Sequence, residues 1–201
     1  PDLYEAELRD LVETSTDEVR RLDHIVDQFL KAIRPSKPQL EPTDINELIK
    51  ESMRFLEPEI KDRGLNLTLE LRSALPVLEL DPDQIKQAFY NIVKNSIQAT
   101  PEGGIITVKT DLSDNHILVT FNDTGEGISA ENLSTVFQPY FTTKKSGTGL
   151  GLLIIRRIIR EHGGDIKISS EEGFGTSVCI SLPRQQRNVR LLPLEQKNKN
   201  L

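Results

Sequence analysis

The chain contains few of the residues that mark secreted or nucleic-acid-binding proteins. Its 201 residues include no tryptophan, one cysteine (Cys179) and one methionine (Met53). One cysteine cannot form a disulfide within the chain, which favours a reducing, cytoplasmic location. Acidic residues outnumber basic residues by 31 to 25, giving a formal net charge of -6. Because binding to nucleic acid requires a basic surface, we expect no nucleic-acid partner.

Long apolar runs and clustered metal ligands are also missing from the sequence. No stretch approaches the roughly 18 apolar residues that cross a bilayer, and no signal peptide opens the chain. We therefore expect membrane contact only through segments outside this sequence. The first residue is Pro1, so we expect the chain to be part of a longer protein. His24, His116 and His162 are too scattered to form a metal cluster with one cysteine.

Residues 1–34 carry the pattern of one long coiled-coil-type helix. Apolar residues recur at alternating spacings of four and three over about four heptads. They are Leu8, Val12, Val19, Leu22, Val26, Phe29 and Ile33. So narrow a stripe favours a partner helix and hence a homodimer, although packing on its own domain is the alternative. Arg34-Pro35 ends the helix, and residues 35–43 are expected to form a linker.

The remaining sequence predicts a two-layer α+β sandwich over residues 44–183, with helices on one face of a sheet. Helices are expected over residues 44–63, 82–99 and 149–162. Strands are expected over residues 65–71, 77–80, 105–111, 117–122, 167–170 and 176–182. Several neighbouring strands are joined by short turns, which argues against a doubly wound parallel sheet. Residues 184–201 are expected to form a flexible tail.

Two segments carry groups that suit a metal ion and a base. Asn91 and Asn95 lie four residues apart in a predicted helix and so share one face. Their amide oxygens suit Mg²⁺ whose negative partner is a phosphate. The segment Asp123-Thr124-Gly125-Glu126-Gly127 directly follows a predicted strand. Its carboxylate can accept from the exocyclic amine of adenine, and its glycines allow the backbone to approach a flat ring.

Two further segments point towards phosphate. Phe137-Gln138-Pro139-Tyr140-Phe141-Thr142-Thr143-Lys144 ends in two hydroxyls and a cation. Gly147-Thr148-Gly149-Leu150-Gly151-Leu152 leads into a predicted helix, where free amides and the helix dipole favour an anion. This is not a P-loop, because no Gly-Lys-Ser/Thr follows. Taken singly, the first segment also fits a polar helix face, the second a glycine turn and the third a packed loop. A glycine-rich loop such as the fourth is weak evidence by itself.

Together and in this order, the segments resemble the catalytic domain of sensor histidine kinases. That domain shares the GHKL superfamily with gyrase, heat-shock chaperone and mismatch-repair ATPases. The segments are similar to the family's asparagine box, first glycine box, phenylalanine box and second glycine box. Gly173-Phe174-Gly175-Thr176 is similar to its closing Gly-Thr element. The resemblance covers about residues 40–183, and the first and third segments look most like the nitrogen-regulation branch. Residues 1–34 resemble the second helix of the family's dimerisation hairpin.

The resemblance implies ATP and Mg²⁺ as cofactors and a role for each segment. Asn95 would bind Mg²⁺, and Asn91 would assist with metal or phosphate. Asp123 would hold adenine in a pocket shaped by Gly125 and Gly127 and supported by Thr176. The other implied nucleotide ligands are Thr143, Lys144, Gly147, Thr148, Gly149, Leu150 and Gly151. Lys144 would lie on a lid over roughly residues 138–148 and would join Asn91 and Asn95 as a catalytic residue.

The sequence departs from the family at the phospho-acceptor. The family's acceptor lies in a His-Glu/Asp-x-x-Asn-Pro pattern, which is absent here; His24 is followed by Ile25-Val26. We therefore expect transfer of the γ-phosphoryl group to a histidine outside this chain, for relay to a response regulator, and no autophosphorylation. His116 is expected in a hairpin turn. His162 is expected at a helix end, where an imidazolium would suit the dipole.

Three other functions compete with that of a histidine kinase. A gyrase-like ATPase is disfavoured, because Asn91 stands where those hydrolases carry a glutamate base. A serine kinase of the anti-sigma type resembles a bare catalytic domain, without the heptad helix of residues 1–34. An interaction module that binds nucleotide without catalysis is disfavoured because no element of the nucleotide site is missing from the sequence.

Overall fold

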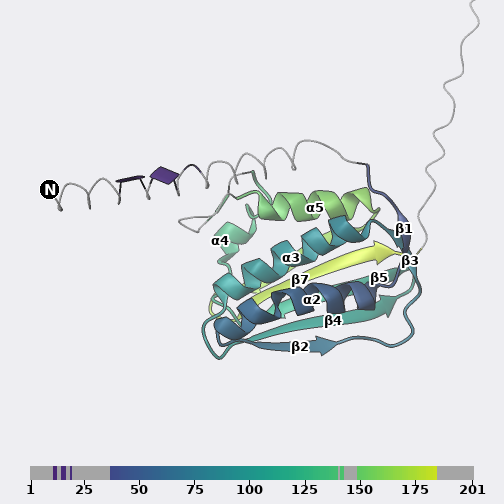
Figure 1. Ribbon diagram of the computed structural model, residues 1–201, viewed down its shortest axis with the longest axis horizontal. Helices are drawn as coiled ribbons and strands as arrows, with labels where there is room; N and C mark the ends of the chain where they lie inside the picture. The colour runs from purple at the N-terminus through teal and green to yellow at the C-terminus, as the bar shows by residue number, and fades with distance from the viewer. Residues whose placement is uncertain are drawn as a thin grey trace, which may run out of the picture.

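The fold is a mixed sheet with helices on one face. The computed structural model describes residues 11, 12, 15, 16, 19, 37–139, 141–142 and 149–184. The five-stranded sheet has the order β2 (Asn66–Glu70), β4 (Ile105–Ser113), β5 (His116–Asp123), β7 (Gly175–Pro183) and β6 (Asp165–Glu171). Helices α2 (Ile45–Asp62), α3 (Pro82–Ala99) and α5 (Gly151–Glu161) cover one face of it (Figure 1). This layering agrees with the predicted two-layer sandwich.

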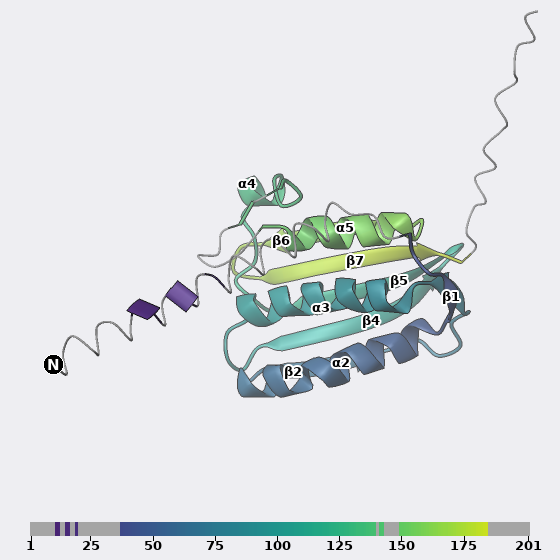
Figure 2. The same ribbon diagram turned by 45° about the horizontal axis from the view of Figure 1, so that its top comes forward.

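The sheet contains one strand pairing that the sequence did not predict. β2 and β4 are parallel, whereas the other neighbours are antiparallel. A parallel pair needs a crossover, and the chain between these strands includes α3. A second pair joins β1 (Glu41–Thr43) to β3 (Leu78–Leu80), so the last residues of the predicted linker are paired with the domain. The short α4 (Ala130–Leu133), also not predicted, lies beside β6 (Figure 2).

Local caps fix the helix boundaries close to their predicted positions. The Asp44 side chain accepts from two amides in the first turn of α2, and the Asp81 side chain caps α3 through the Gln84 amide. Pro82 follows as the first residue of α3, where its missing N–H costs nothing. Gly64, at φ +65°, follows the end of α2.

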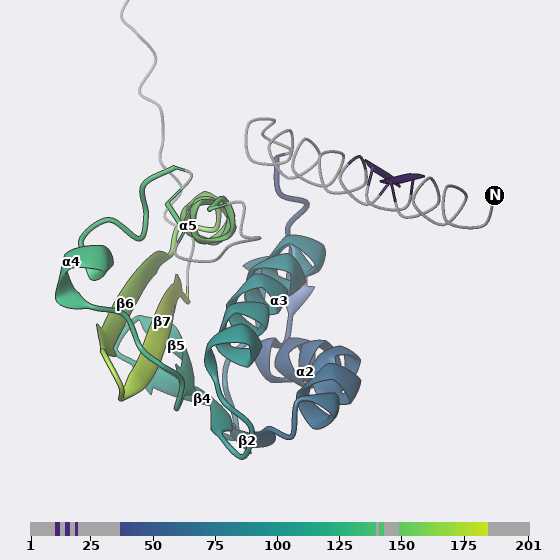
Figure 3. The same ribbon diagram turned by 90° about the vertical axis from the view of Figure 1, so that its left-hand side faces the viewer.

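The core lies between the helices and the sheet. The helices lie in one layer over one face of the sheet (Figure 3). Their buried apolar residues form one core cluster with alternating apolar residues of the strands. Phe89 of α3 and Phe121 of β5 are fully buried and have ring centroids 5.3 Å apart. Among the described residues, no helix is long and apolar enough to cross a membrane.

The predicted helix over residues 1–34 and the tail fall mostly outside the described residues. Leu11, Val12 and Val19 are helical and more than half exposed. The long helix, its seam and the environment of His24 therefore remain predictions.

The structure confirms that His162 lies at a helix end, as the C-cap residue of α5, but it corrects the charge expected for His162 and the position expected for His116. His162 is 1% exposed; its Nδ1 lies 2.8 Å from the Ile158 carbonyl, and its Nε2 accepts the Asp81 amide at 3.0 Å. A nitrogen that accepts an N–H carries no proton, so the ring is a neutral Nδ1–H tautomer and the predicted imidazolium is wrong. His116 is the first residue of β5 and pairs with Ser113, so the turn lies at Asp114 and Asn115.

Removing the buried imidazole should destabilise the domain. We expect His162→Ala to lower the free energy of unfolding by about 3 kcal/mol, because the Asp81 amide loses its acceptor and a cavity opens. The exposed His116 provides the matched control, and His116→Ala should change stability by less than about 0.5 kcal/mol. Urea unfolding followed by circular dichroism measures both, and equal effects would contradict the structural role of His162.

Candidate functional site

The core-facing side of the sheet becomes polar at one end. Along β5, β7 and β6, the inward positions are apolar until the last register position, which holds Asp123, Thr176 and Ser170. Asp123 pairs with Thr176, and Thr176 pairs with Ser170. Directly opposed residues of antiparallel strands project from the same face. Three polar side chains from three strands therefore form one row, which we call the polar row.

Asp123 is the buried centre of this row. It is 8% exposed, and its Oδ1 accepts the amides of Gly125 and Thr176, each at 3.1 Å. Its Oδ2 accepts the Ser96 hydroxyl at 2.8 Å. Two backbone amides and one hydroxyl thus donate to this carboxylate. A carboxylate has about four lone-pair sites, so Oδ2 can still accept from one donor on a ligand.

Ser96 is a site residue that the sequence analysis missed. It lies on the buried face of α3, next to the predicted metal ligand Asn95, and is 4% exposed. A hydroxyl within an otherwise apolar stripe of Ile92, Val93 and Ile97 was the available signal, because buried hydroxyls require partners.

Gly125 and Gly127, in the segment that we call the first glycine segment (residues 123–127), allow close backbone packing. At Gly127, with φ +71°, an added Cβ would lie 2.0 Å from the Glu171 carbonyl oxygen. At Gly125, it would lie 2.7 Å from the Ala99 carbonyl oxygen. Protein backbone fills these positions, so the two glycines shape the site by bringing the loop against α3 and the β6–β7 turn.

The predicted metal ligands lie on α3. Asn91 and Asn95 are half-buried, whereas Ile92 and Val93 between them are buried. The two amides therefore lie beside the core-facing stripe, near the end of α3 that also carries Ser96.

The start of α5 lies at the same end of the domain as the end of α3 (Figure 1). Its N-cap residue is Leu150, whose side chain cannot accept a hydrogen bond, and Gly149 before it has φ +67°. An added Cβ on Gly151 would meet no atom of the described residues within 4 Å. At the first turn of this helix, the helix dipole favours an anion.

Part of the predicted phosphate loop lies outside the described residues. Thr143, Lys144, Gly147 and Thr148 are not described, whereas Gly149, Leu150 and Gly151 are. The lid and its lysine therefore remain predictions.

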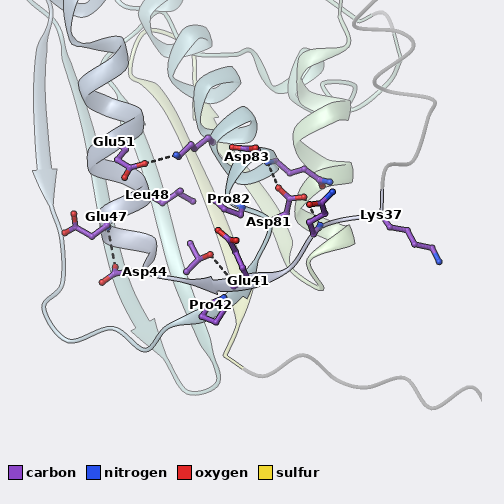
Figure 4. Close-up of a pocket in the computed structure, with 14 residues that line it drawn as sticks. Lys37, Glu41, Pro42, Asp44, Glu47, Leu48, Glu51, Asp81, Pro82 and Asp83 are labelled. Atoms are coloured by element: carbon purple, nitrogen blue, oxygen red, sulfur yellow. Dashed lines mark hydrogen bonds and ion pairs between the residues drawn. The ribbon is translucent and has the colours of Figure 1, made fainter.

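Another hollow lies away from the polar row. It has a volume of about 700 Å³ and lies around β1 and the first turns of α2 and α3, at the opposite end of α3 from Ser96 (Figure 4). Carboxylates dominate its lining: Glu41, Asp44, Glu47, Glu51, Asp81 and Asp83, with Lys37 and Lys86. Such a lining repels an anion, which disfavours this hollow as a site for a phosphorylated ligand.

Comparison with known proteins identifies the family. Residues 80–186, more than half of the chain, match the family described as histidine kinase-, DNA gyrase B- and HSP90-like ATPase. The chain belongs to this family. Sensor histidine kinase ZraS of Escherichia coli K12 is 34% identical over 177 residues, which are 88% of this chain and 38% of ZraS. Sporulation kinase E of Bacillus subtilis is 35% identical over 85% of this chain and 23% of its own length.

The relatives narrow the assignment to a histidine kinase catalytic domain. The catalytic domain of histidine kinase ThkA superposes with a TM-score of 0.67 at 34% identity, covering 73% of this chain and 96% of that domain. ThkA in complex with response regulator protein TrrA gives a TM-score of 0.74 at 30% identity, over 89% of this chain and 52% of that one. The chain spans well under half the length of ZraS and sporulation kinase E.

Proposed function

We propose that this domain binds ATP with Mg²⁺ and transfers the γ-phosphoryl group to a histidine on a dimerisation helix outside the 201 residues, for relay to a response regulator. The buried Asp123, which accepts from three donors and has one accepting position left, carries the proposal. ShkA, which shares the fold with a TM-score of 0.76 at 23% identity, was solved in complex with AMPPNP. The structure of ThkA with a response regulator supports the partner.

The described residues fit an adenine nucleotide. Asp123 can accept one proton of the adenine amino group, and Thr176 beside it adds a second polar atom. The first-turn amides of α5, beginning at Gly151, can hold phosphate. Thr143, Lys144, Gly147 and Thr148 complete this arrangement as the proposed lid and phosphate loop.

Asn91 and Asn95 fit Mg²⁺ as neutral oxygen ligands. Mg²⁺ generally keeps several waters and takes its anionic partners from phosphates, so it needs only one or two protein oxygens. When bound, the ion neutralises charge that develops on the phosphates. Neither amide can take a proton from water, so these residues support transfer to a positioned acceptor better than hydrolysis.

The parent protein is proposed to act as a homodimer through residues 1–34, with any membrane anchor in segments outside this chain. The form of the Asn91–Ala99 segment favours the nitrogen-regulation-like branch of the family. An interaction module that retains nucleotide binding alone is the second candidate, and the phosphorylation experiment in the Discussion separates the two.

The metal assignment predicts a selective loss of affinity. Asn95→Ala should weaken ATP binding about tenfold in the presence of Mg²⁺ and much less in excess EDTA, because Asn95 is the proposed Mg²⁺ ligand. Gln98→Ala, an exposed position one turn further along α3, should behave like the parent chain. Isothermal titration calorimetry under both conditions measures the difference. Equal weakening with and without Mg²⁺ would refute the metal role.

A further inference from the structure

One hydroxyl in the polar row joins two segments of the candidate site. Ser170 Oγ, on β6, lies 2.8 Å from the Ile128 amide, in the loop that follows Gly127. The same atom lies 2.7 Å from the Gly175 carbonyl oxygen and 3.0 Å from Thr176 Oγ1. Ser170 therefore connects the first glycine segment to the strand that carries Thr176.

Counting protons fixes the direction of each of these bonds. A carbonyl oxygen only accepts, so the single proton of Ser170 goes to Gly175, and the Ile128 amide donates to Ser170. Ser170 then has no proton left for Thr176, and Thr176 must be the donor between them. The hydroxyl proton of Thr176 is thus directed towards Ser170 on one side, away from Asp123 on the other.

The direction of that proton determines what the base pocket offers. Thr176 Oγ1 presents only lone pairs to the space beside Asp123, and the Asp123 carboxylate is also acceptor-only. Two acceptors suit the amino group at position 6 of adenine. Two acceptors repel a carbonyl oxygen at the same position, which is the group that hypoxanthine carries there.

We propose that Ser170 is a positioning residue for base selectivity: it takes the Thr176 proton and so keeps the edge of the pocket beside Asp123 acceptor-only. Ser170 acts through Thr176 and need not touch the nucleotide. The inference rests on the proposed nucleotide site and adds a residue that neither the motifs nor their spacing indicated.

The test compares ATP with inosine triphosphate, which carries a carbonyl oxygen in place of the amino group. In Ser170→Ala the Thr176 hydroxyl is free to rotate and donate to that carbonyl, so the ATP preference should fall about tenfold, the value of one hydrogen bond. Ser170→Thr keeps a hydroxyl and should retain the preference of the parent chain. Calorimetry with both nucleotides measures the ratio of Kd values, after circular dichroism has confirmed folding.

A purely structural role for Ser170 predicts a different result. Equal weakening of both nucleotides in Ser170→Ala, or no change in either, would overturn the proposal. Thr176→Val provides a second route, because it removes the selecting hydroxyl and leaves the Ser170 bonds to Ile128 and Gly175 in place. That variant should lose preference to the same extent, and an unchanged ratio would overturn the proposal even if Ser170→Ala fails to fold. If the parent chain binds neither nucleotide, the proposed function fails first.

Discussion

Asp123→Asn should reduce ATP affinity by about a hundredfold, which corresponds to roughly 3 kcal/mol. Oδ1 accepts two backbone amides that cannot reverse, so the oxygen of the new amide must occupy that position. The NH₂ group then replaces Oδ2. It faces the Ser96 hydroxyl, which can rotate to accept, and the amino group of adenine, which cannot. A donor would meet a donor at a buried position.

The matched control for this substitution is Asp165→Asn. Asp165 is an exposed residue at the start of β6, and the change carries the same loss of charge. Calorimetry should find its ATP affinity equal to that of the parent chain. If Asp123→Asn also retains full affinity, the base is held elsewhere and the assignment of Asp123 is wrong.

The chain alone should acquire no phosphohistidine from ATP. His116 begins β5 and Asp123 ends it, which separates them by about 23 Å along an extended strand. His162 is buried at the far end of α5, about 16 Å from Gly151 along the helix. Transfer requires the acceptor nitrogen in line with the γ-phosphate, so neither of these histidines can be the acceptor.

The experiment uses γ-labelled ATP and an acid-lability test. We expect no acid-labile label on the parent chain or on His24→Gln. Adding a separate fragment that carries a His-Glu-x-x-Asn-Pro helix should place acid-labile label on that fragment, and Asp123→Asn should strongly reduce this transfer at ATP concentrations near the Kd of the parent chain. Acid-labile label on the parent chain that disappears in His24→Gln would overturn the prediction of an external acceptor. Nucleotide binding without transfer to the fragment would favour the interaction module.

Local sequence signals predicted the helix boundaries of the domain well. Asp44 and Asp81-Pro82 are capping signals that act within one turn, so the starts of α2 and α3 could be located to within about two residues. The β1–β3 pair and the parallel β2–β4 pair were not predicted, because pairing depends on contacts distant in sequence. The four-residue α4 is too short to show a helical period.

The candidate site was predictable only where motifs mark it. Asp123 and Thr176 belong to recognisable segments, and the structure places them side by side. Ser96 and Ser170 carry no motif of their own, and their importance arises from hydrogen bonds to Asp123 and to Ile128, Gly175 and Thr176. His162 lies at the predicted helix end, but sequence position does not reveal its burial or its bond to the Asp81 amide, so the expected charge was wrong.

The arrangement of the polar row has a consequence for folding cooperativity. Asp123 and Thr176 are 53 residues apart in sequence and meet only across the central β5–β7 pair. Contacts of such long range form late, after shorter loops have closed. The base pocket therefore cannot survive in either half of the domain, and loss of nucleotide binding should accompany separation of the central strands in a single transition.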